Sequence, residues 1–319
     1  MRDIRITDNE AGQRLDRFLR KLLKDESLKD IYKYIRKGII KVNGKKAKEN
    51  YRIQIDDIIT LYNIDIDTKK TYRESFKEIN IVYEDDNLII VNKPSGLLSH
   101  PESPDDNDTL IQRVTGHILK SGIENYSPTF SPALCNRLDR NTSGLVIAAK
   151  NYDTLKNINE MIRDGGLIKH YLCIVKGIPE DKGEIKSIIR KDKRKRLAIL
   201  EATGEMDGKE ARTKYEKLRD NGEFSLLNVE LITGKFHQIR VHLSSLGHPI
   251  IGDGKYGDKN INSFFDKNFG LKHQFLIAHS LYFKDPHSSL KYLKGKRWNS
   301  SIPKNFKIII QALFGDIKV

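Results

Sequence analysis

The sequence predicts an α+β protein in two parts. A small α/β module comes first, and a larger domain built on a mixed, mostly antiparallel β-sheet follows it. Three observations support this fold class. The chain has 319 residues, enough for two domains. Its first 62 residues are strongly basic and contain two helical patterns, whereas strand patterns dominate after residue 79. In that second part strands and helices mix without strict βαβ alternation, which favours an antiparallel sheet.

The N-terminal module, residues 1–62, is predicted to contain two helices and a hairpin. Five apolar residues follow the spacing of one helix face: Leu15, Phe18, Leu19, Leu22 and Leu23. A second helix is expected to begin at Ser27, as an N-cap, and to end at Gly38. Asn43-Gly44 is a strong two-residue turn between Ile39–Val42 and a basic return strand.

Positive charge is concentrated in this module. Residues 14–50 carry thirteen Lys or Arg and five Asp or Glu, a net charge of +8 out of +14 for the whole chain. A solvated charged face is common on a single helix, but charge spread over two helices and a hairpin predicts nucleic-acid binding. A second basic cluster, at 190–196, is predicted to be a loop that contacts phosphate. The RNA contacts predicted in the module are Arg14, Arg17, Lys37, Lys45 and Lys46.

Composition narrows the class of protein further. The pI of about 9.5 indicates a polyanionic partner. Two cysteines, Cys135 and Cys173, lie in separate segments, so a disulfide framework is not expected. The N-terminus lacks the apolar core of a signal peptide, and no run approaches the roughly 18 apolar residues of a membrane span. We therefore expect a cytoplasmic protein without a membrane partner.

The second domain, residues 79–319, follows a predicted linker at 63–78. Two short strands are expected in INIVYEDDNLIIVNKP, and further strands in LVIAAK, HYLCIVKG and FSLLNVELI. Residues 153–166 have the spacing of a helix that ends at a glycine pair. Another helix, containing Ile239, is expected to end at Gly247 with a proline two residues later.

The stretch 135-CNRLDRNTSGLVIAAK-150 places one carboxylate, Asp139, between Arg137 and Arg140 at the mouth of a predicted buried strand. Nearby positive charge favours the ionised carboxylate, so Asp139 is a poor general acid at neutral pH and a good nucleophile or base. The alternative is a buried aspartate that only satisfies arginine and backbone donors. This stretch alone favours the alternative, and a chemical role for Asp139 depends on the segments that accompany it.

Two more segments supply candidate groups. Tyr171 heads the strand in KHYLCIVKG, and Arg240 lies in TGKFHQIRVHLSSLGHPIIGDGKYG. In the latter, Thr233-Gly234-Lys235 precedes a helix, a natural place to hold phosphate against backbone N–H groups. A metal site is not expected, because the three histidines of that segment lack a zinc-ligand spacing. A glycosidase needs a second carboxylate, for which Asp253 is the candidate.

These motifs carry a resemblance to known families. The segments 14-RLDRFLRKLL-23 and 35-IRKGIIKVNGKKAK-48 resemble the S4 RNA-binding domain. From 90-IVNKPSGLLSHP-101 onward the chain resembles RluA-type pseudouridine synthases, and within them the large-subunit rRNA enzymes of the RluC and RluD kind. The carrying motifs are NRLDRNTSGLVIAAK, KHYLCIV, TGKFHQIRVHLSSLGHPIIGD and the pair Ala278-His279. Their order is kept over nearly the whole chain.

The resemblance implies a pseudouridine synthase fold and isomerisation of specific uridines, nearest to RluC-like activity on 23S rRNA, without metal or cofactor. Asp139 would be the essential residue, and whether it attacks sugar or base or removes a sugar proton stays open. Arg240 would hold that carboxylate ionised. Tyr171 would stack on a uracil flipped out of its helix, and Arg137 would help to extrude it. Further RNA contacts are implied for Arg140, Lys235 and His237.

Two positions depart from the family pattern: Asn136 stands where histidine is usual, and Lys235 where arginine is usual. Neither replaces an implied catalytic residue, so the departures affect RNA contacts. The competing hypothesis is a non-catalytic RNA-binding or ribosome-assembly protein with an S4 module. The expected partner is large-subunit rRNA, free or in an assembling particle, and the protein is expected to be a monomer.

Overall fold

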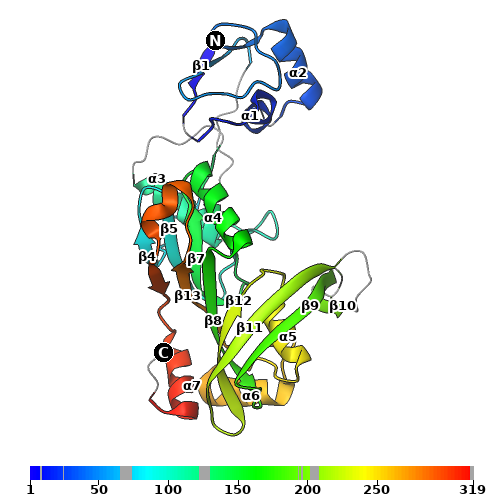
Figure 1. Ribbon diagram of the computed structural model, residues 1–319, viewed down its shortest axis with the longest axis vertical. Helices are drawn as coiled ribbons and strands as arrows, with labels where there is room; N and C mark the ends of the chain where they lie inside the picture. The colour runs from blue at the N-terminus through cyan, green and yellow to red at the C-terminus, as the bar shows by residue number, and fades with distance from the viewer. Residues whose placement is uncertain are drawn as a thin grey trace.

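A computed structural model describes residues 1–7, 9–23, 25–64, 74–121, 130–192, 194, 197–201 and 208–316. The first part of the chain forms a three-stranded antiparallel sheet, in the order β1-β3-β2, packed against two helices (Figure 1). Its elements are β1 (Arg2–Arg5), α1 (Leu15–Leu22), α2 (Leu28–Lys37), β2 (Ile40–Val42) and β3 (Ile58–Leu61).

The predicted helices of this module are confirmed at their ends. The Ser27 hydroxyl accepts a hydrogen bond from the Asp30 amide at 3.2 Å and so caps α2. Gly38 ends the same helix in the left-handed region, at φ +73°. The apolar stripe of α1 is buried and faces the small sheet. The module therefore has a hydrophobic core of its own, with its cations outside.

The predicted hairpin is half right. Val42 and Lys45 exchange backbone hydrogen bonds of 2.9 and 3.0 Å across the two-residue turn. The return strand is wrong, because β2 pairs with Ile58–Leu61 instead. The residues after the turn, KKAK, offer no alternating apolar face, whereas β3 buries Ile59 and Leu61 against the helices.

The second part of the chain is built on one eleven-stranded sheet. Its strands are β4 (Ile81–Glu84), β5 (Leu88–Lys93), β6 (Ala133–Leu134), β7 (Ser143–Ala149), β8 (Leu167–Lys176), β9 (Lys182–Asp192), β10 (Leu197–Glu201), β11 (Lys209–Asp220), β12 (Phe224–Leu231), β13 (Leu276–Phe283) and β14 (Arg297–Asn299). Its helices are α3 (Leu110–Lys120), α4 (Tyr152–Asp164), α5 (Gln238–Ser245), α6 (Lys259–Phe269), the 3-10 helix η1 (Ser288–Leu293) and α7 (Lys304–Phe314).

The strand order is β10-β9-β11-β12-β8-β13-β7-β5-β4, with β14 on β13 and β6 on β7. Among the described strands only β13 and β7 run parallel, so the prediction of a mixed, mostly antiparallel sheet is confirmed. The strand β13, late in the sequence, lies between β8 and β7 and joins the two halves of the sheet (Figure 1). This crossing brings segments far apart in sequence to one place.

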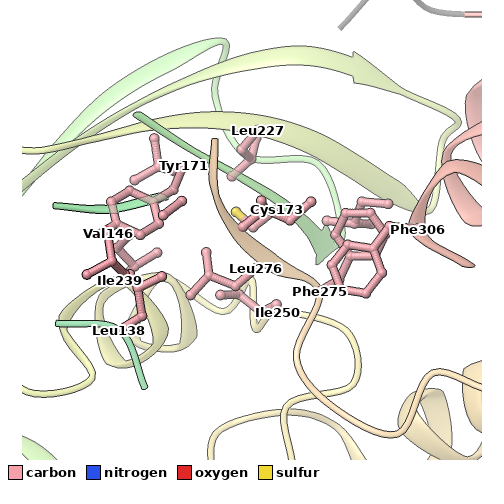
Figure 2. Packing of buried hydrophobic residues seen from close by; sticks show 14 of the residues in the cluster. Leu138, Val146, Tyr171, Cys173, Leu227, Ile239, Ile250, Phe275, Leu276 and Phe306 are labelled. Carbon is pink, nitrogen blue, oxygen red and sulfur yellow. The ribbon is translucent and has the colours of Figure 1, made fainter. Parts of the chain in front are cut away.

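The central strand β7 explains the continuous apolar run seen in the sequence, since all seven of its residues are buried. Val146 and Ala148 face one hydrophobic cluster, and Leu145 and Ile147 face another. The first cluster also contains Tyr171 and Leu138, so the candidate site lies on this side of the sheet (Figure 2).

Three remaining expectations concern helices and connections. The helix predicted at 153–166 is confirmed as α4, which Gly165 ends at φ +75°. Of the predicted linker, residues 65–73 lie outside the described residues. Of the basic cluster at 190–196, residues 190–192 continue β9 rather than forming a loop, and residues 193, 195 and 196 are not described. Within the described ranges, no helix has both the length and the apolar character needed to span a bilayer.

Candidate active site

Asp139 lies in the short loop between β6 and β7, and its side chain is 27% exposed. The loop turns back on itself, because the Thr142 amide donates to the Asp139 carbonyl oxygen at 3.1 Å. β7 then begins at once, at Ser143. Asp139 is therefore presented from the end of the most buried strand in the sheet, which holds its backbone in place.

A buried lysine that the sequence analysis did not single out anchors this loop. Lys93, at the end of β5, is only 1% exposed. Its ammonium donates to the carbonyl oxygens of Pro94, Leu97 and Arg140, at 2.9, 2.7 and 2.9 Å. Burial lowers the pKa of Lys93 to about 7, and the negative charge of Asp139 opposes that shift. The three carbonyl groups satisfy every proton of the ammonium, so one side chain ties the 93–97 segment to the Asp139 loop.

Two more contacts fix the ends of the loop. The Ser99 hydroxyl donates to the Leu138 carbonyl oxygen at 2.8 Å and accepts from the Leu138 amide at 3.2 Å. At the other end, Gly144 has φ +114°, and a Cβ built on it would lie 2.2 Å from the Ala278 carbonyl oxygen of β13. Only glycine allows β13 to pass this close to the loop.

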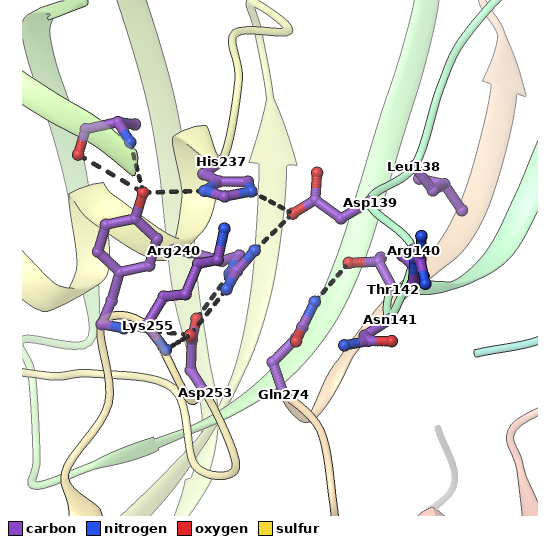
Figure 3. Close-up of polar contacts among 12 residues, drawn as sticks. Leu138, Asp139, Arg140, Asn141, Thr142, His237, Arg240, Asp253, Lys255 and Gln274 are labelled. Atoms are coloured by element: carbon purple, nitrogen blue, oxygen red, sulfur yellow. Dashed lines mark hydrogen bonds and ion pairs between the residues drawn. The ribbon is translucent and has the colours of Figure 1, made fainter. Parts of the chain in front are cut away.

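Arg240, on α5, clamps two carboxylates (Figure 3). Its Nη1 donates to Asp139 Oδ2 at 2.8 Å, and its Nε and Nη2 donate to Asp253 at 2.6 and 2.8 Å. Burial alone would lower the pKa of Arg240, but the two carboxylates reverse the shift and raise it. Burial raises the pKa of Asp253, and hydrogen bonds from Arg240 and from two backbone amides outweigh it and lower that pKa. Both partners of this buried pair are therefore charged.

This geometry corrects one expectation about Asp139. Its partner is Arg240, a hundred residues away, and not the flanking Arg137 and Arg140, both of which are exposed. Burial lowers the pKa of His100, and the nearby charge of Arg137 lowers it further. Arg140 contributes its carbonyl oxygen to Lys93. The flanking arginines therefore present charge to solvent beside the site.

Tyr171, on β8, is 5% exposed and packs in the same cluster as Leu138 and Ile239 (Figure 2). Burial raises the pKa of its phenol, and the charge of Asp139 raises it further. The phenol therefore stays protonated near the carboxylate. The three residues predicted to be catalytic, Asp139, Tyr171 and Arg240, thus come from a loop, a strand and a helix that meet beside β13.

His237, predicted as an RNA contact, lies deeper than expected, at 8% exposed. Its Nε2 is 3.8 Å from Asp139 Oδ2, and its Nδ1 is 2.9 Å from the Tyr256 hydroxyl (Figure 3). Burial lowers the pKa of His237 to about 4, against the opposing charge of Asp139. A neutral imidazole therefore stands beside the carboxylate.

The two departures from the family pattern have different structural settings. Asn136 takes part in the sheet: its Oδ1 accepts from the Ile147 amide at 2.8 Å, and its Nδ2 donates to the Leu145 carbonyl oxygen at 3.3 Å. Lys235 is half-buried, and its amide donates to the side chain of Gln238 at 3.0 Å. That amide is thus already hydrogen-bonded within the protein.

The predicted RNA contacts of the N-terminal module fall into two groups. Arg17, Lys37, Lys45 and Lys46 are exposed. Arg14 instead pairs with Asp16 through two contacts, of 3.1 and 2.8 Å, and is half-buried. The exposed four present their charge to solvent, whereas Arg14 helps to hold the start of α1.

Comparison with known proteins agrees with this fold. Residues 87–245 match the RNA pseudouridylate synthase family, and residues 13–59 match the S4 domain. The chain is 30% identical to ribosomal large subunit pseudouridine synthase C of Vibrio cholerae, over 90% of each protein. It is 34% identical to the protein of that name from Buchnera aphidicola, over 89% of each. Human RNA pseudouridylate synthase domain containing 4 shares the fold, with a TM-score of 0.56 and 24% identity over 73% of this chain and 92% of that one.

Proposed function

The chain belongs to the RNA pseudouridylate synthase family and is an isomerase, and from this premise we propose that it converts specific uridines of large-subunit ribosomal RNA into pseudouridine. Two relatives that match it over about nine-tenths of its length are named for that subunit. The S4 domain and the exposed cations of the N-terminal module supply a surface for structured RNA.

The observation that carries the chemical part of the proposal is the setting of Asp139. Its carboxylate is paired at 2.8 Å with a buried arginine, yet the side chain is 27% exposed. An accessible carboxylate that a buried guanidinium holds in place is what a nucleophile or base requires. In the reaction the N1–C1′ bond of uridine breaks, a C5–C1′ bond forms, and the proton lost from C5 is balanced by one gained at N1.

The other roles follow from where each side chain lies. The reacting atoms of uracil are shielded in a stacked helix, so the base must flip out at a cost of a few kcal/mol. Arg137, exposed in the same loop as Asp139, is proposed to take the space that the base leaves, and Tyr171 is proposed to border the site as an aromatic wall. Arg140 and the Lys235 ammonium are proposed to contact phosphate. The protein is proposed to act as a monomer.

The test is conversion of uridine in 23S rRNA transcribed without modification. Wild-type protein is expected to form pseudouridine, and Asp139→Asn to lose about 10⁴-fold or more in rate, because the amide keeps the shape but not the charge. Asp86→Asn, at an exposed turn between β4 and β5, is the matched control and is expected to keep full activity. Conversion by Asp139→Asn at the wild-type rate would remove Asp139 from the mechanism. Unconverted uridine with wild-type protein would contradict the substrate.

A further inference from the structure

The two carboxylate oxygens of Asp139 have different surroundings. Oδ2 accepts from Arg240 at 2.8 Å and faces His237 Nε2 at 3.8 Å. Within the ranges that the structure describes, Oδ1 has no hydrogen-bond partner. One oxygen is therefore hydrogen-bonded to a guanidinium and has an imidazole close by, and the other is free to meet a substrate (Figure 3).

The proton on His237 is assigned by a chain of hydrogen bonds that starts in β10. The Ala198 amide donates to the Tyr256 hydroxyl oxygen at 2.6 Å. The proton of that hydroxyl is then directed to His237 Nδ1, at 2.9 Å, in preference to the Ala198 carbonyl oxygen at 3.5 Å. Since Nδ1 accepts, the neutral ring carries its proton on Nε2, the nitrogen that faces Asp139.

The ring itself has little freedom. His237 adopts φ +53°, an uncommon conformation for a residue with a side chain, at the N-terminal end of α5. Its ring stacks on Phe236, with centroids 3.7 Å apart, and Phe236 in turn lies under the ammonium of Lys191 on β9. Stacking on Phe236 fixes the plane of the His237 ring, and the hydrogen bond to the Tyr256 hydroxyl fixes the direction in which Nδ1 points.

Burial is the main reason that the His237 ring stays neutral, and the charged groups around it act in both directions. Besides Asp139, the groups that act on it are Arg240, Lys255 and Asp253, with the two cations disfavouring a third positive charge. Burial acts in the same direction and is the largest cause. A neutral donor supports an ionised carboxylate without competing for the proton that the reaction moves.

We propose that His237 and Tyr256 are positioning residues, which hold Oδ2 of Asp139 through a His237 Nε2–H group and leave Oδ1 as the oxygen that reacts. The inference rests on the proposed function, in which Asp139 acts on the uridine. At 3.8 Å the contact is longer than a hydrogen bond, and such contacts commonly shorten when substrate binds. The chain of contacts also joins the edge strand β10 to the catalytic loop.

Kinetics on the full-length protein test the positioning role. His237→Ala is expected to lower kcat by roughly 10²-fold with little change in KM for RNA, because the carboxylate loses orientation and not affinity. His237→Gln places an amide N–H near the position of Nε2 and is expected to recover most of the loss. Tyr256→Phe, which removes only the hydroxyl, is expected to lose about tenfold in kcat. Equal losses for Ala and Gln, or a loss confined to KM, would overturn the proposal.

A spectroscopic measurement tests the proton assignment without any activity. In protein labelled with ¹⁵N-histidine, the His237 signals are identified by their absence from His237→Gln. The expected spectrum at pH 7 is the Nε2–H tautomer, with a mixture of tautomers in Tyr256→Phe. An Nδ1–H tautomer or an imidazolium in the wild-type protein would overturn the assignment. Absence of pseudouridine with wild-type protein would instead overturn the proposed function, and the spectrum would still decide where the proton lies.

Discussion

The N-terminal module and the catalytic domain both use positive charge, but they hold it in different ways. In the module, Arg17, Lys37 and Lys45 project into solvent. In the catalytic domain, Arg240 and Lys93 are 5% and 1% exposed, and each donates three hydrogen bonds to carboxylate or carbonyl oxygens. Solvated cations attract a polyanion at a distance, whereas buried and bonded cations fix atoms in place.

This difference predicts which Lys and Arg residues can be substituted with little effect. An exposed cation contributes to a sum of phosphate contacts, so losing one weakens affinity by a small step. A buried cation has partners that stay behind when it is removed, and each such partner then carries the cost of a buried charge or carbonyl group without a partner. The position of a Lys or Arg in the fold, rather than its residue type, therefore decides whether its substitution has a small or a large effect.

The largest expected effect comes from the buried pair. Arg240→Met should destabilise the catalytic domain by about 3–5 kcal/mol, because Asp253, 0% exposed, is left charged without its partner. Activity should be lost as well, since Asp139 loses the same guanidinium. Thermal unfolding and the rate of pseudouridine formation measure the two effects.

A double variant separates the causes. Arg240→Met with Asp253→Asn should regain part of the stability, because the uncompensated charge is gone, but none of the activity. Arg17→Met, in the module, is the matched control and should unfold like wild type. If Arg240→Met also unfolds at the wild-type temperature, the contrast between the two kinds of cation is lost.

A smaller effect for each group is expected from acid. Burial lowers the pKa of both His237 and His242 to about 4, against about 6.5 in an unfolded chain. Between these values the unfolded chain binds protons that the folded domain excludes, so stability present above pH 6.5 is lost as pH falls toward 4. The loss is on the order of 2–3 kcal/mol for each histidine.

Melting temperatures from pH 7 to pH 4.5 measure this loss. Any substitution of His242 is expected to cost stability, because its ring nitrogens lie 2.8 Å from the Ser187 hydroxyl and 2.9 Å from the Thr213 hydroxyl. His242→Gln should therefore melt lower at pH 7 but show a shallower dependence on pH. All nine histidines lie beyond residue 62, so the module should not add to this sensitivity. If the melting temperature of His242→Gln depends on pH as steeply as that of wild type, His242 does not contribute to the loss of stability in acid.

The smallest effect is expected in the module. Lys45→Gln with Lys46→Gln should weaken binding to an rRNA fragment a few-fold at 0.1 M salt and flatten the plot of log K against log salt by about 1.5 to 2. The value of kcat at saturating RNA should not change. Lys259→Gln with Lys267→Gln, on exposed positions of α6, is the matched control. A full salt dependence in the Lys45 and Lys46 variant would show that these cations do not meet phosphate.

Much of the fold was predictable because local patterns and burial agree. The capped helix from Ser27 to Gly38 and the buried strand after Asp139 both carry their signals within a few residues. The hairpin failed for a related reason: Asn43-Gly44 specifies a turn, but the turn does not choose its partner strand. The distant strand β3 took that place because it has apolar residues to bury.

The site was less predictable, since its key contacts join distant segments. The pairing of Asp139 with Arg240 was implied by resemblance, and no spacing within the sequence indicates it. Lys93 stood in a Lys-Pro-Ser-Gly run typical of a turn, and nothing local shows that its ammonium is buried under three carbonyl groups. His237 and Tyr256 likewise acquire their relation only when α5 and the loop after it fold against β10.

The central position of β13 in the sheet determines when the domain can fold during its synthesis. Residues 276–283 fill the gap between β8, which carries Tyr171, and β7, which follows Asp139. During synthesis β7 and β8 emerge from the ribosome long before β13, so the two halves of the sheet can be joined only after β13 has emerged. The strands that hold Tyr171 and Asp139 can therefore take their places in a nascent chain only after residues 276–283 have left the ribosome.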